Sequence, residues 1–401
     1  MKGFCGVQNR SLLLSLKAFC IEQLSIVYGF KGEKFYFRPS EILMGELLNP
    51  KNIIVRMPNW VGDMVMATPI LVDLRRAFPH AKITAMCRTP LSELLEEDPD
   101  VDEIFSFSKT SPFSRHSDRK GIVEKLQQGK YDLGILLTNS LSSAWWFWQG
   151  KVQNRIGFDT KGRGLLLTHP VPLPGGIHEQ HLVTTYKQLL TSIDLPISTT
   201  PPRIFVSEEE ISQARNLLRQ HGISEHHQII GINPGATYGS AKCWLPERFR
   251  EITRRLLEDK NVFVIYFGDQ ATSSLVKEIS YGLSPRVVNL AGLTSLRELA
   301  SLLTRCDVLL TNDSGPMHIA AALSVPIVAL FGSTSKEVTG PFCSGVVIQK
   351  AVECSPCYQR TCPIDFRCMK KIETDEVYQE LINVLHNKKQ KHPILPISKS
   401  C

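Results

Sequence analysis

Residues 308–335 read VLLTNDSGPMHIAAALSVPIVALFGSTS, and this stretch decides the fold. Its two apolar runs, Val308–Thr311 and Val325–Phe331, have the length of buried strands. Asn312–Gly315 between them has turn chemistry, and Pro316 suits the first turn of a helix. The pattern predicts a βαβ unit whose helix begins just after the first strand ends.

Four residues of this unit are suited to contact with a nucleotide sugar. The exposed amides of Ser314 and Gly315, the positive end of the helix dipole and the imidazole of His318 would attract a diphosphate. Asp313 could accept hydrogen bonds from hydroxyl groups, which a nucleotide sugar also carries. The structural alternative is that Asp313 caps the helix and His318 is a histidine of the core.

A second stretch, IIGINPGATYGSAKCWLPERF at residues 229–249, repeats the arrangement. A strand over Ile229–Asn233 leads into a loop rich in Gly and Ser, and a helix begins near Pro246. Lys242 on this loop would neutralise phosphate as a mobile charge, whereas the structural alternative is an ordinary solvated lysine.

A third strand, in VFVIYFGDQ at residues 262–270, ends at Gly268 and Asp269. Carboxylates at the carboxyl ends of parallel strands lie where open α/β sheets bind ligands. Asp269 is therefore a candidate partner for a ribose hydroxyl.

The length of the chain indicates two domains. It has 401 residues, of which 43% are hydrophobic, and this exceeds what one usual core needs. A proline-rich passage with Pro196, Pro201 and Pro202 suits a linker. We expect an N-terminal extension of amphipathic character at 1–50, a first domain at 51–195, the linker at 196–203, a second domain at 204–386 and a basic tail at 387–401.

The first domain alternates strands and helices in the same way as the second. We predict the following elements: strands at Ile53–Arg56, Lys82–Met86, Glu103–Phe107 and Leu133–Leu137, a loop at Met57–Asp63 and a helix from about Ala67 to Phe78. This alternation in both domains indicates the α/β class with parallel sheets.

Asp63 lies in the predicted loop between the first strand and its helix. A carboxylate at the mouth of a cleft between two α/β domains could remove a proton from an acceptor hydroxyl while the other domain holds a leaving diphosphate. The structural alternative is an acidic residue at the N-cap or in the first turn of the helix.

Several motifs occur in an order that resembles one enzyme family. PNWVGDMVMATP, PGATYGSAKCWLPERF and TNDSGPMHIAAAL followed by PIVALFGSTS are similar to the ADP-heptose:lipopolysaccharide heptosyltransferases of glycosyltransferase family 9. LLTNSLSSAWWFW and NRIGF make the resemblance closest to the heptosyltransferase II branch, and it spans roughly Lys51 to Leu385. The resemblance implies a GT-B fold, in which two Rossmann-like domains face a central cleft. The first domain would take a lipid-linked sugar acceptor and the second would take the nucleotide sugar.

The same resemblance implies an inverting transfer of heptose from ADP-heptose to the inner core of lipopolysaccharide. Asp63 matches the general base and Lys242 the lysine that contacts phosphate. The remaining matches on the donor side are Asp313, Ser314, Gly315, His318 and Asp269. These groups would stabilise the departing ADP electrostatically, so no metal or other cofactor is required. Pro316 stands where many members have Leu, which leaves other nucleotide sugars open as donors.

The segment around the aromatic run at 145–148 is the candidate acceptor side. Four polar residues near it could bind acceptor sugar or phosphate: Asn139, Ser140, Ser143 and Arg155. The run itself, three Trp and one Phe, could stack on sugar or touch lipid, but such a run on a helix favours buried core. His178 and His181 have helical spacing without partner acids, which favours an ordinary helix surface over a metal site.

Eleven cysteines are present, and four of them cluster as C-x2-C-x4-C-x5-C: Cys354, Cys357, Cys362 and Cys368. Four close thiolates can form a tetrahedral site, so structural zinc is one interpretation. The spacing departs from the usual pair of C-x2-C motifs, and disulfides are not expected in a cytoplasmic protein. Reduced or redox-sensitive thiols without a catalytic role are the favoured interpretation.

Charge and hydropathy limit the partners. No stretch has the apolar length of a membrane-spanning helix, and Asn9, Arg10 and Lys17 interrupt the start of the chain, unlike a signal peptide. The net charge of +7 and the lysines of the tail suit contact with anionic lipid, although a disordered soluble tail is the alternative. We expect a cytoplasmic enzyme, peripheral on the inner face of the cytoplasmic membrane, that acts on a lipid A–core acceptor.

Other functional classes fit less well. Nucleic-acid binding lacks a recognisable reading motif, and a dehydrogenase lacks G-x-G-x-x-G after the first strand. Two alternatives stay open: a GT-B glycosyltransferase that uses another nucleotide sugar, and a non-catalytic nucleotide-binding protein.

Overall fold

A computed structural model of the chain describes residues 26–28, 34–36, 49–108, 116–175, 179–342 and 345–391. Strands β1 (Ile26–Tyr28) and β2 (Lys34–Tyr36) pair antiparallel within a unit that comprises residues 1–46, and residues 47–401 form the other unit. The expected N-terminal extension and basic tail lie largely outside the described residues, so their amphipathic and lipid-binding character stays a prediction.

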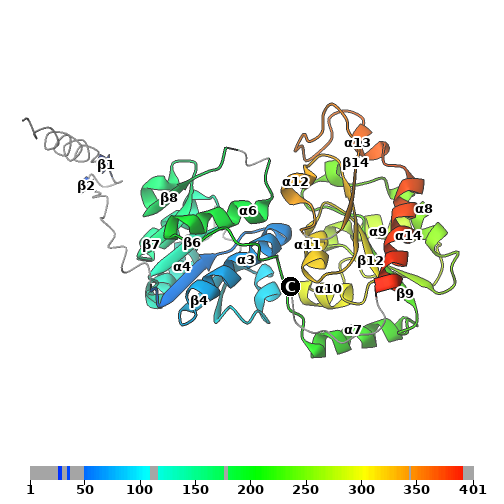
Figure 1. Cartoon of the computed structure of the whole chain (residues 1–401), viewed down its shortest axis with the longest axis horizontal. Coiled ribbons are helices and arrows are strands. Elements are labelled where there is room, and N and C mark those ends of the chain that lie inside the picture. The colour runs from blue at the N-terminus through cyan, green and yellow to red at the C-terminus, as the bar shows by residue number, and fades with distance from the viewer. Residues whose placement is uncertain are drawn as a thin grey trace, which may run out of the picture. The chain divides into compact units, whose positions relative to one another are not determined.

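The first half of the larger unit is a six-stranded parallel sheet in the order β5-β4-β3-β6-β7-β8 (Figure 1). Its strands are β3 (Asn52–Arg56), β4 (Lys82–Arg88), β5 (Glu103–Phe107), β6 (Leu133–Leu136), β7 (Asn154–Asp159) and β8 (His169–Pro172). Its α-helices are α3 (Val61–Ala77), α4 (His116–Gly129), α5 (Leu141–Gln149) and α6 (Leu182–Lys187). Three short 3₁₀ helices complete it: η1 (Leu91–Leu95), η2 (Arg163–Leu166) and η3 (Gln188–Ile193).

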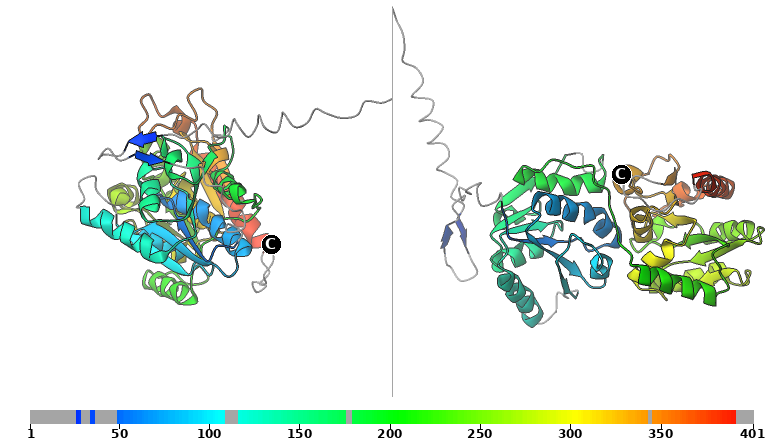
Figure 2. Two further views of the ribbon diagram at one scale, coloured as in Figure 1. Left: turned by 90° about the vertical axis from the view of Figure 1, so that its left-hand side faces the viewer. Right: turned by 60° about the horizontal axis from the view of Figure 1, so that its bottom comes forward.

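The second half is also a six-stranded parallel sheet, in the order β11-β10-β9-β12-β13-β14 (Figure 2). Its strands are β9 (Gln228–Asn233), β10 (Val262–Tyr266), β11 (Val287–Asn289), β12 (Val308–Asn312), β13 (Ile327–Phe331) and β14 (Val346–Gln349). Its α-helices are α7 (Glu208–Gln220), α8 (Pro246–Leu256), α9 (Ser273–Ser280), α10 (Leu296–Leu303), α11 (Gly315–Ala322), α12 (Lys336–Thr339), α13 (Arg367–Lys370) and α14 (Thr374–Lys391). Two 3₁₀ turns, η4 (Ser240–Lys242) and η5 (Gln270–Thr272), lie in loops.

Both sheets have the Rossmann strand order. In each one the first strand in sequence is central, the next two lie on one side and the last three on the other. The order therefore reverses between β3 and β6 in the first sheet and between β9 and β12 in the second. Ligands of open α/β sheets bind at such reversals, outside the carboxyl ends of the strands. The predicted fold class, two Rossmann-like α/β domains, is confirmed.

The strands form where the sequence has unbroken apolar runs. Every residue of β10 and β13 is buried, as expected for strands covered on both faces by helices. Helix α8 also begins at Pro246, as predicted. Strand β13 begins at Ile327 rather than at Val325, because Pro326 has no N–H to donate to a neighbouring strand.

The predicted loop at Met57–Asp63 is too long. Helix α3 begins at Val61, so Asp63 lies in its first turn and not on a loop before it. The start of α3 has the composition of a loop, with Asn59, Trp60 and Gly62. A glycine near the start of a helix destabilises it little when tertiary packing fixes the helix. Residues 64–74 of α3 are all buried, and this packing determines where the helix lies.

The two halves share one apolar cluster. Helix α3 packs against α11, and Met64 and Val65 belong to the same buried cluster as Met317 and Ile319. Among the described residues no helix has both the length and the apolar character that crossing a membrane requires.

The proline-rich linker is bonded to the first half. The Ser198 and Thr200 hydroxyls donate to the two carboxylate oxygens of Asp73 on α3, over 2.7 and 2.9 Å. Lys187 donates to the carbonyl oxygens of Ser198 and Thr200 over 2.9 and 2.6 Å. The guanidinium of Arg203 pairs with Asp98 and Asp100. The linker is thus an ordered strap rather than a flexible tether.

Candidate active site

The first turns of α3 and α11 meet in close contact. A Cβ on Gly62 would lie 2.6 Å from Cδ2 of His318, and a Cβ on Gly315 would lie 2.7 Å from Cβ of Val61. No larger residue fits at either position without a shift of its neighbour. Two glycines, one from each half, therefore bring Asp63 of α3 close to the loop that precedes α11.

Asp63 is partly buried beside two charged residues of the second half. Removal from water raises the pKa of its carboxyl to about 6, while the charge of Lys242 opposes this rise and that of Asp313 adds to it. A carboxylate with a pKa near neutrality is suited to proton transfer. The fold thus brings together three site residues that lie far apart in the sequence.

Asp313 is the centre of a buried polar cluster. Its Oδ2 accepts hydrogen bonds from Lys242 Nζ and from the hydroxyl of Thr334, each over 2.6 Å, and from the hydroxyl of Thr339 over 3.3 Å. The side chains of Lys242 and Asp313 are 13% and 4% exposed. Lys242 is therefore not the solvated lysine of the structural alternative, and Asp313 precedes the N-cap position instead of capping α11.

The start of α11 supplies amides that point beyond the carboxyl end of β12. Ser314 is the N-cap residue, and its hydroxyl is bonded to the Asn233 amide and to Thr311 over 3.0 Å in each case. The N–H groups of a helix's first turn have no acceptor within the helix, so they can bind an anion. Ser314 and Gly315 lie at this position, as predicted for the donor loop.

His318 is fully buried on α11. Burial lowers the pKa of its imidazole to about 4; Asp313 opposes the shift, while His181 and Lys242 add to it. The imidazole is therefore neutral near pH 7. It can donate one hydrogen bond to a phosphate, but it adds no positive charge, which differs from the electrostatic attraction that the sequence suggested.

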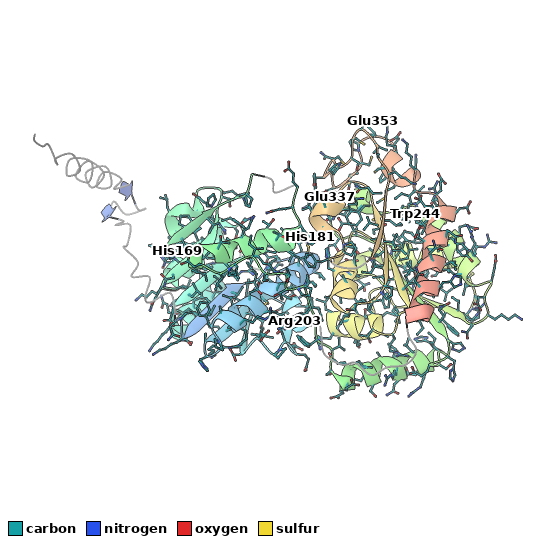
Figure 3. The ribbon with its side chains drawn as sticks, in the orientation of Figure 1. His169, His181, Arg203, Trp244, Glu337 and Glu353 are labelled. Carbon is teal, nitrogen blue, oxygen red and sulfur yellow. The ribbon has the colours of Figure 1, made fainter. Side chains whose placement is uncertain are left out.

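The prediction that His181 lies on an ordinary helix surface is wrong. Its Nδ1 accepts a hydrogen bond from the amide of Val183 and so caps α6, and its Nε2 lies 2.9 Å from the carbonyl oxygen of Gly340 in the other half. Figure 3 labels His181 where α6 approaches the second half. Its neighbour in the motif, His178, lies outside the described residues.

Asp269 lies away from the Asp313 cluster, at the end of β10. Its carboxylate caps η5 by accepting from the Thr272 amide over 2.9 Å, and it accepts from the Thr237 hydroxyl over 3.1 Å. The residue is exposed, so these bonds leave it accessible to solvent. Its predicted contact with ribose stays a prediction.

The predicted acceptor residues hold the loops after β6 and β7. The Ser140 hydroxyl caps α5, and the buried Ser143 hydroxyl bonds to Thr138 over 2.9 Å. Arg155 donates to backbone carbonyl oxygens of Leu166 and Val152 over 2.7 and 2.6 Å. Asn139 is exposed at the end of β6, on the side of the sheet where its strand order reverses.

Arg163, which the sequence analysis did not single out, orders the loops after β6 and β7. It is completely buried, donates to the carbonyl oxygens of Phe158 and Thr138, and lies 3.2 Å from Oδ1 of Asn139. Burial lowers the pKa of its guanidinium to about 10. No motif in the sequence signals a buried arginine, whereas Thr334 could have been found from the polar GSTS that comes after a strand.

The aromatic run is divided between core and surface. Trp146 and Phe147 are buried, as the core interpretation predicted, but Trp145 is 48% exposed and lies against Trp148, with ring centroids 4.9 Å apart and the rings tilted by 46°. The helix places members of the run on different faces. One pair of tryptophans is therefore available at the surface of the first half.

The arrangement has the parts that a group transfer from a diphosphate needs. One half supplies a partly buried carboxyl group with a pKa near neutrality, and the other supplies a lysine, a neutral imidazole and a helix start. The lysine and the helix start suit a negatively charged leaving group, and the carboxylate suits an attacking hydroxyl. The four predicted cysteines form a cluster of their own on the segment after β14.

Comparison with known proteins gives the following similarities. The family described as glycosyltransferase family 9 (heptosyltransferase) matches residues 119–366. The chain is 32% identical to lipopolysaccharide heptosyltransferase 2 of Escherichia coli K12, over 72% of this chain and 85% of that protein. It is 31% identical to lipooligosaccharide heptosyltransferase 2 of Haemophilus ducreyi, over 75% of this chain and 89% of that protein.

A solved structure of the ADP-heptose lipopolysaccharide heptosyltransferase II of E. coli is similar over almost its whole length. The TM-score is 0.73 at 29% identity, and the match covers 84% of this chain and 99% of the other. The predicted GT-B architecture is thereby confirmed.

Proposed function

This chain belongs to glycosyltransferase family 9, the heptosyltransferases, and on that premise we propose that it transfers heptose from ADP-heptose to the inner core of lipopolysaccharide, in the manner of a heptosyltransferase II. Its relatives in E. coli and H. ducreyi bear the names of lipopolysaccharide and lipooligosaccharide heptosyltransferases. The enzyme is a glycosyltransferase, and the donor, the acceptor and the residue roles are the proposed parts.

One observation carries the mechanism: Asp63 of the first half lies within electrostatic reach of Lys242 and Asp313 of the second. In the proposed reaction, residues 204–386 hold the nucleotide sugar and residues 51–195 hold the acceptor. Asp63 then faces an acceptor hydroxyl from the side opposite to the departing ADP.

Stabilisation of the leaving group falls to the second half. The Lys242 ammonium, the amides of Ser314 and Gly315 and a hydrogen bond from neutral His318 would neutralise charge that develops on the diphosphate. Asp313 keeps Lys242 in place through the 2.6 Å bond. These donors perform the task that a bound metal performs in other enzymes, so we propose that the transfer itself requires no metal or other cofactor.

Activation of the nucleophile falls to Asp63. As the anomeric carbon gains oxocarbenium character, the carboxylate removes the proton from the attacking hydroxyl, and attack opposite to ADP inverts the anomeric centre. The raised pKa makes Asp63 a stronger base than a solvated aspartate while leaving it mostly ionised near pH 7.

The last part of the proposal is where the acceptor binds and where in the cell the enzyme acts. Asn139 at the end of β6 and the surface pair Trp145 and Trp148 are the proposed contacts for a lipid A–core acceptor. With a net charge of +7, the protein would lie on the anionic inner face of the cytoplasmic membrane as a peripheral enzyme.

Calorimetric titration with ADP, UDP and GDP, first without added Mg²⁺ and then with it, tests the proposal. We expect preferential ADP binding that does not need Mg²⁺ and that weakens about tenfold or more in Lys242→Ala, because a charged hydrogen bond contributes roughly 1.5–3 kcal/mol. Lys277→Ala, which removes an exposed lysine of α9, is the matched control and should bind as the wild type does.

Three outcomes oppose parts of the proposal. Preference for UDP or GDP keeps the enzyme class but replaces the donor. Binding of ADP without transfer to any heptose-containing core acceptor contradicts the reaction. Equal ADP affinity in Lys242→Ala and the wild type contradicts the role of Lys242.

A further inference from the structure

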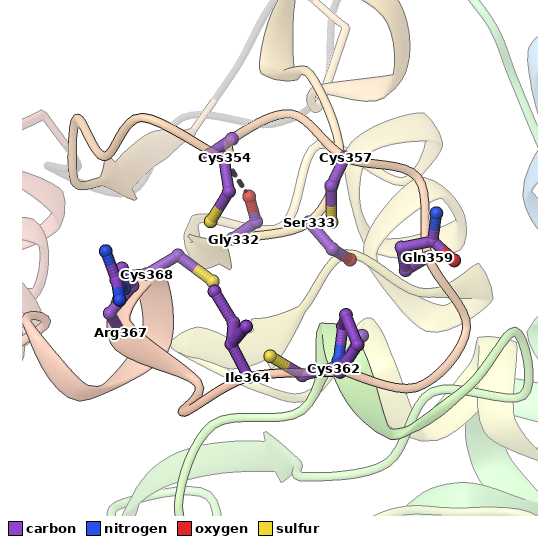
Figure 4. Close-up of a pocket in the computed structure, with 12 residues that line it drawn as sticks. Gly332, Ser333, Cys354, Cys357, Gln359, Cys362, Ile364, Arg367 and Cys368 are labelled. Atoms are coloured by element: carbon purple, nitrogen blue, oxygen red, sulfur yellow. Dashed lines mark hydrogen bonds between the residues drawn. The ribbon is translucent and has the colours of Figure 1, made fainter.

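Four cysteines surround a cavity that Ala241, the neighbour of Lys242, also lines. Cys354, Cys357, Cys362 and Cys368 line a space of about 60 Å³, closed on the other side by Gly332 and Ser333 at the end of β13 (Figure 4). All four are free thiols. They come from one segment that starts after β14 and ends in α13, so a single loop carries the whole cluster.

Two polar groups at the cavity suit a bound ligand. The Ser333 side chain is 1% exposed, and its hydroxyl has no hydrogen-bond partner among the described residues, although it lines this cavity. A buried hydroxyl without a partner is unfavourable, because it has given up its bonds to water. The amide of Phe366 also donates to Sγ of Cys362 over 3.3 Å, so a backbone N–H already faces one of the sulfurs.

The thiols lie within electrostatic reach of one another. All four side chains line the same cavity. Four thiolates around one cavity repel each other unless a cation lies between them. A divalent ion would remove this repulsion and would give the Ser333 hydroxyl a thiolate to donate to.

We propose that Cys354, Cys357, Cys362 and Cys368 bind one divalent metal ion of the zinc class in a tetrahedral site. Four thiolate ligands select this class of metal. Each thiol releases its proton to solvent as its bond to the metal forms, and no electron is transferred.

The loop must close slightly when the metal binds. No group of three or more His, Cys, Asp or Glu side chains in the described residues is already arranged to hold an ion. The cavity of about 60 Å³ is roomier than a metal ion alone needs, since about 10–15 Å³ of such space already holds one water. Metal–sulfur bonds of about 2.3 Å would draw the four sulfurs inward.

The cysteine loop also supports the loop that carries Lys242. The Ala241 amide donates to the carbonyl oxygen of Arg360 over 3.0 Å. The Tyr238 hydroxyl donates to the carbonyl oxygen of Tyr358 over 2.8 Å. The Tyr358 amide in turn donates to the carbonyl oxygen of Ser333 over 2.7 Å. We infer that the metal fixes the position of Lys242; this consequence rests on the proposed function, whereas the metal site does not.

Cobalt(II) titration of the reduced full-length chain tests the site, because cobalt in tetrahedral thiolate sites absorbs visible light. We expect one cobalt per chain, bleaching on addition of zinc, and about one zinc-class ion per chain by elemental analysis of protein purified without chelator. Cys362→Ser, at a partly exposed position, should lose most of the absorption. Cys306→Ala, outside the cluster, is the control and should keep it.

The proposal is overturned if the wild type develops no cobalt absorption, if Cys362→Ser absorbs as strongly as the wild type, or if the purified chain holds disulfides among these cysteines instead of metal. The wild-type titration needs no variant, so misfolding of Cys362→Ser does not affect it.

A second measurement separates the site from its consequence. ADP affinity should fall several-fold when the metal is removed and return when zinc is restored. Unchanged affinity would overturn the support of Lys242 and leave the metal site standing. Cobalt binding by a chain that binds no ADP under any condition would contradict the proposed function and not the site.

Discussion

The two sheets of this protein have the same strand order but differ in the connection that leaves their first strand. After β3 the chain enters α3 within a few residues, and Asp63 is held in the first turn of that helix. After β9 the chain runs from Pro234 to Leu245 before α8 begins, and this longer connection carries Lys242 across to β12. The shared topology places both connections at a reversal of strand order. The short connection leaves Asp63 in the first turn of a helix, whereas the long one lets Lys242 reach Asp313.

The difference extends to the charges. The first half presents one carboxylate whose pKa is raised mainly by burial. The second half presents a carboxylate that is bonded to Lys242 and to two threonine hydroxyls. In the proposed mechanism the base has to be an aspartate that can take up a proton, whereas the leaving-group site needs an aspartate that stays ionised and holds Lys242. Substitution of Asp63 should therefore affect the reaction rate, and substitution of Asp313 should affect ADP binding.

The largest effect is expected from Asp63→Asn. Loss of the base should lower kcat by about 10² to 10⁴ while ADP affinity stays near that of the wild type, because the residue belongs to the other half. Steady-state rates and calorimetry on the same preparation measure both quantities. A parallel loss of ADP affinity would assign Asp63 to the donor site.

Asp313→Asn should act on binding and on stability together. Removal of the carboxylate leaves the Lys242 ammonium buried without its charged partner, and breaking a buried pair costs about 3–5 kcal/mol. Thermal unfolding and ADP titration measure the change. Glu103→Gln breaks an exposed pair with Lys82 in the first half and is the control, with an expected loss of at most about 1 kcal/mol. Equal losses in the two variants would contradict the central place of Asp313.

Lowering the pH should reduce kcat/KM, which depends on Asp63 of the first half, before it reduces ADP affinity, which depends on the second half. Since Asp63 must be ionised to act as a base, kcat/KM should be flat above pH 7 and fall about tenfold per pH unit below about pH 6. His318, with its pKa lowered to about 4, stays neutral through this range, so ADP affinity should change little. The test is to measure kcat/KM and ADP affinity over the same pH range. If both fall at the same pH, the proposed difference between Asp63 and the ADP site is contradicted.

Gly62→Ala should have a smaller effect at the contact between the halves. The new methyl group would meet the His318 ring at 2.6 Å, so one of the two must move, and overpacking of this kind costs about 1–3 kcal/mol. We expect a several-fold loss in kcat/KM. Gly121→Ala on α4 has open space around it and should instead stabilise the fold by up to about 1 kcal/mol, as measured by thermal unfolding. A rate loss in Gly121→Ala similar to that of Gly62→Ala would count against a specific contact.

The strands could be predicted well from the sequence, because buried parallel strands are short apolar runs that are visible locally. The start of α3 could not, since Gly62 resembles a loop residue until the His318 ring that packs on it is known. The sequence singled out Lys242 and Asp313 individually, but it could not show that they are partners. Lys242 and Asp313 are 71 positions apart, and only the parallel pairing of β9 with β12 brings their loops together.

Other parts of the site had no sequence signal. A buried arginine such as Arg163 is unusual, and only the carbonyl oxygens that it reaches in the folded chain explain it. His181 caps a helix with one ring nitrogen and bonds to the other half with the second, a pair of contacts that spacing within HEQHLVTTY does not indicate.

The bonded linker determines how the enzyme can move. Because Asp73 and Lys187 hold the chain as far as Thr200, and Arg203 is paired with Asp98, the covalent connection is anchored to the first half almost to its end. On the other side, Arg297 of α10 bonds to the carbonyl oxygen of Phe205. The backbone between Arg203 and Phe205 is therefore the hinge point of the connection, because any change in the angle between the halves has to be absorbed by the dihedral angles of these few residues.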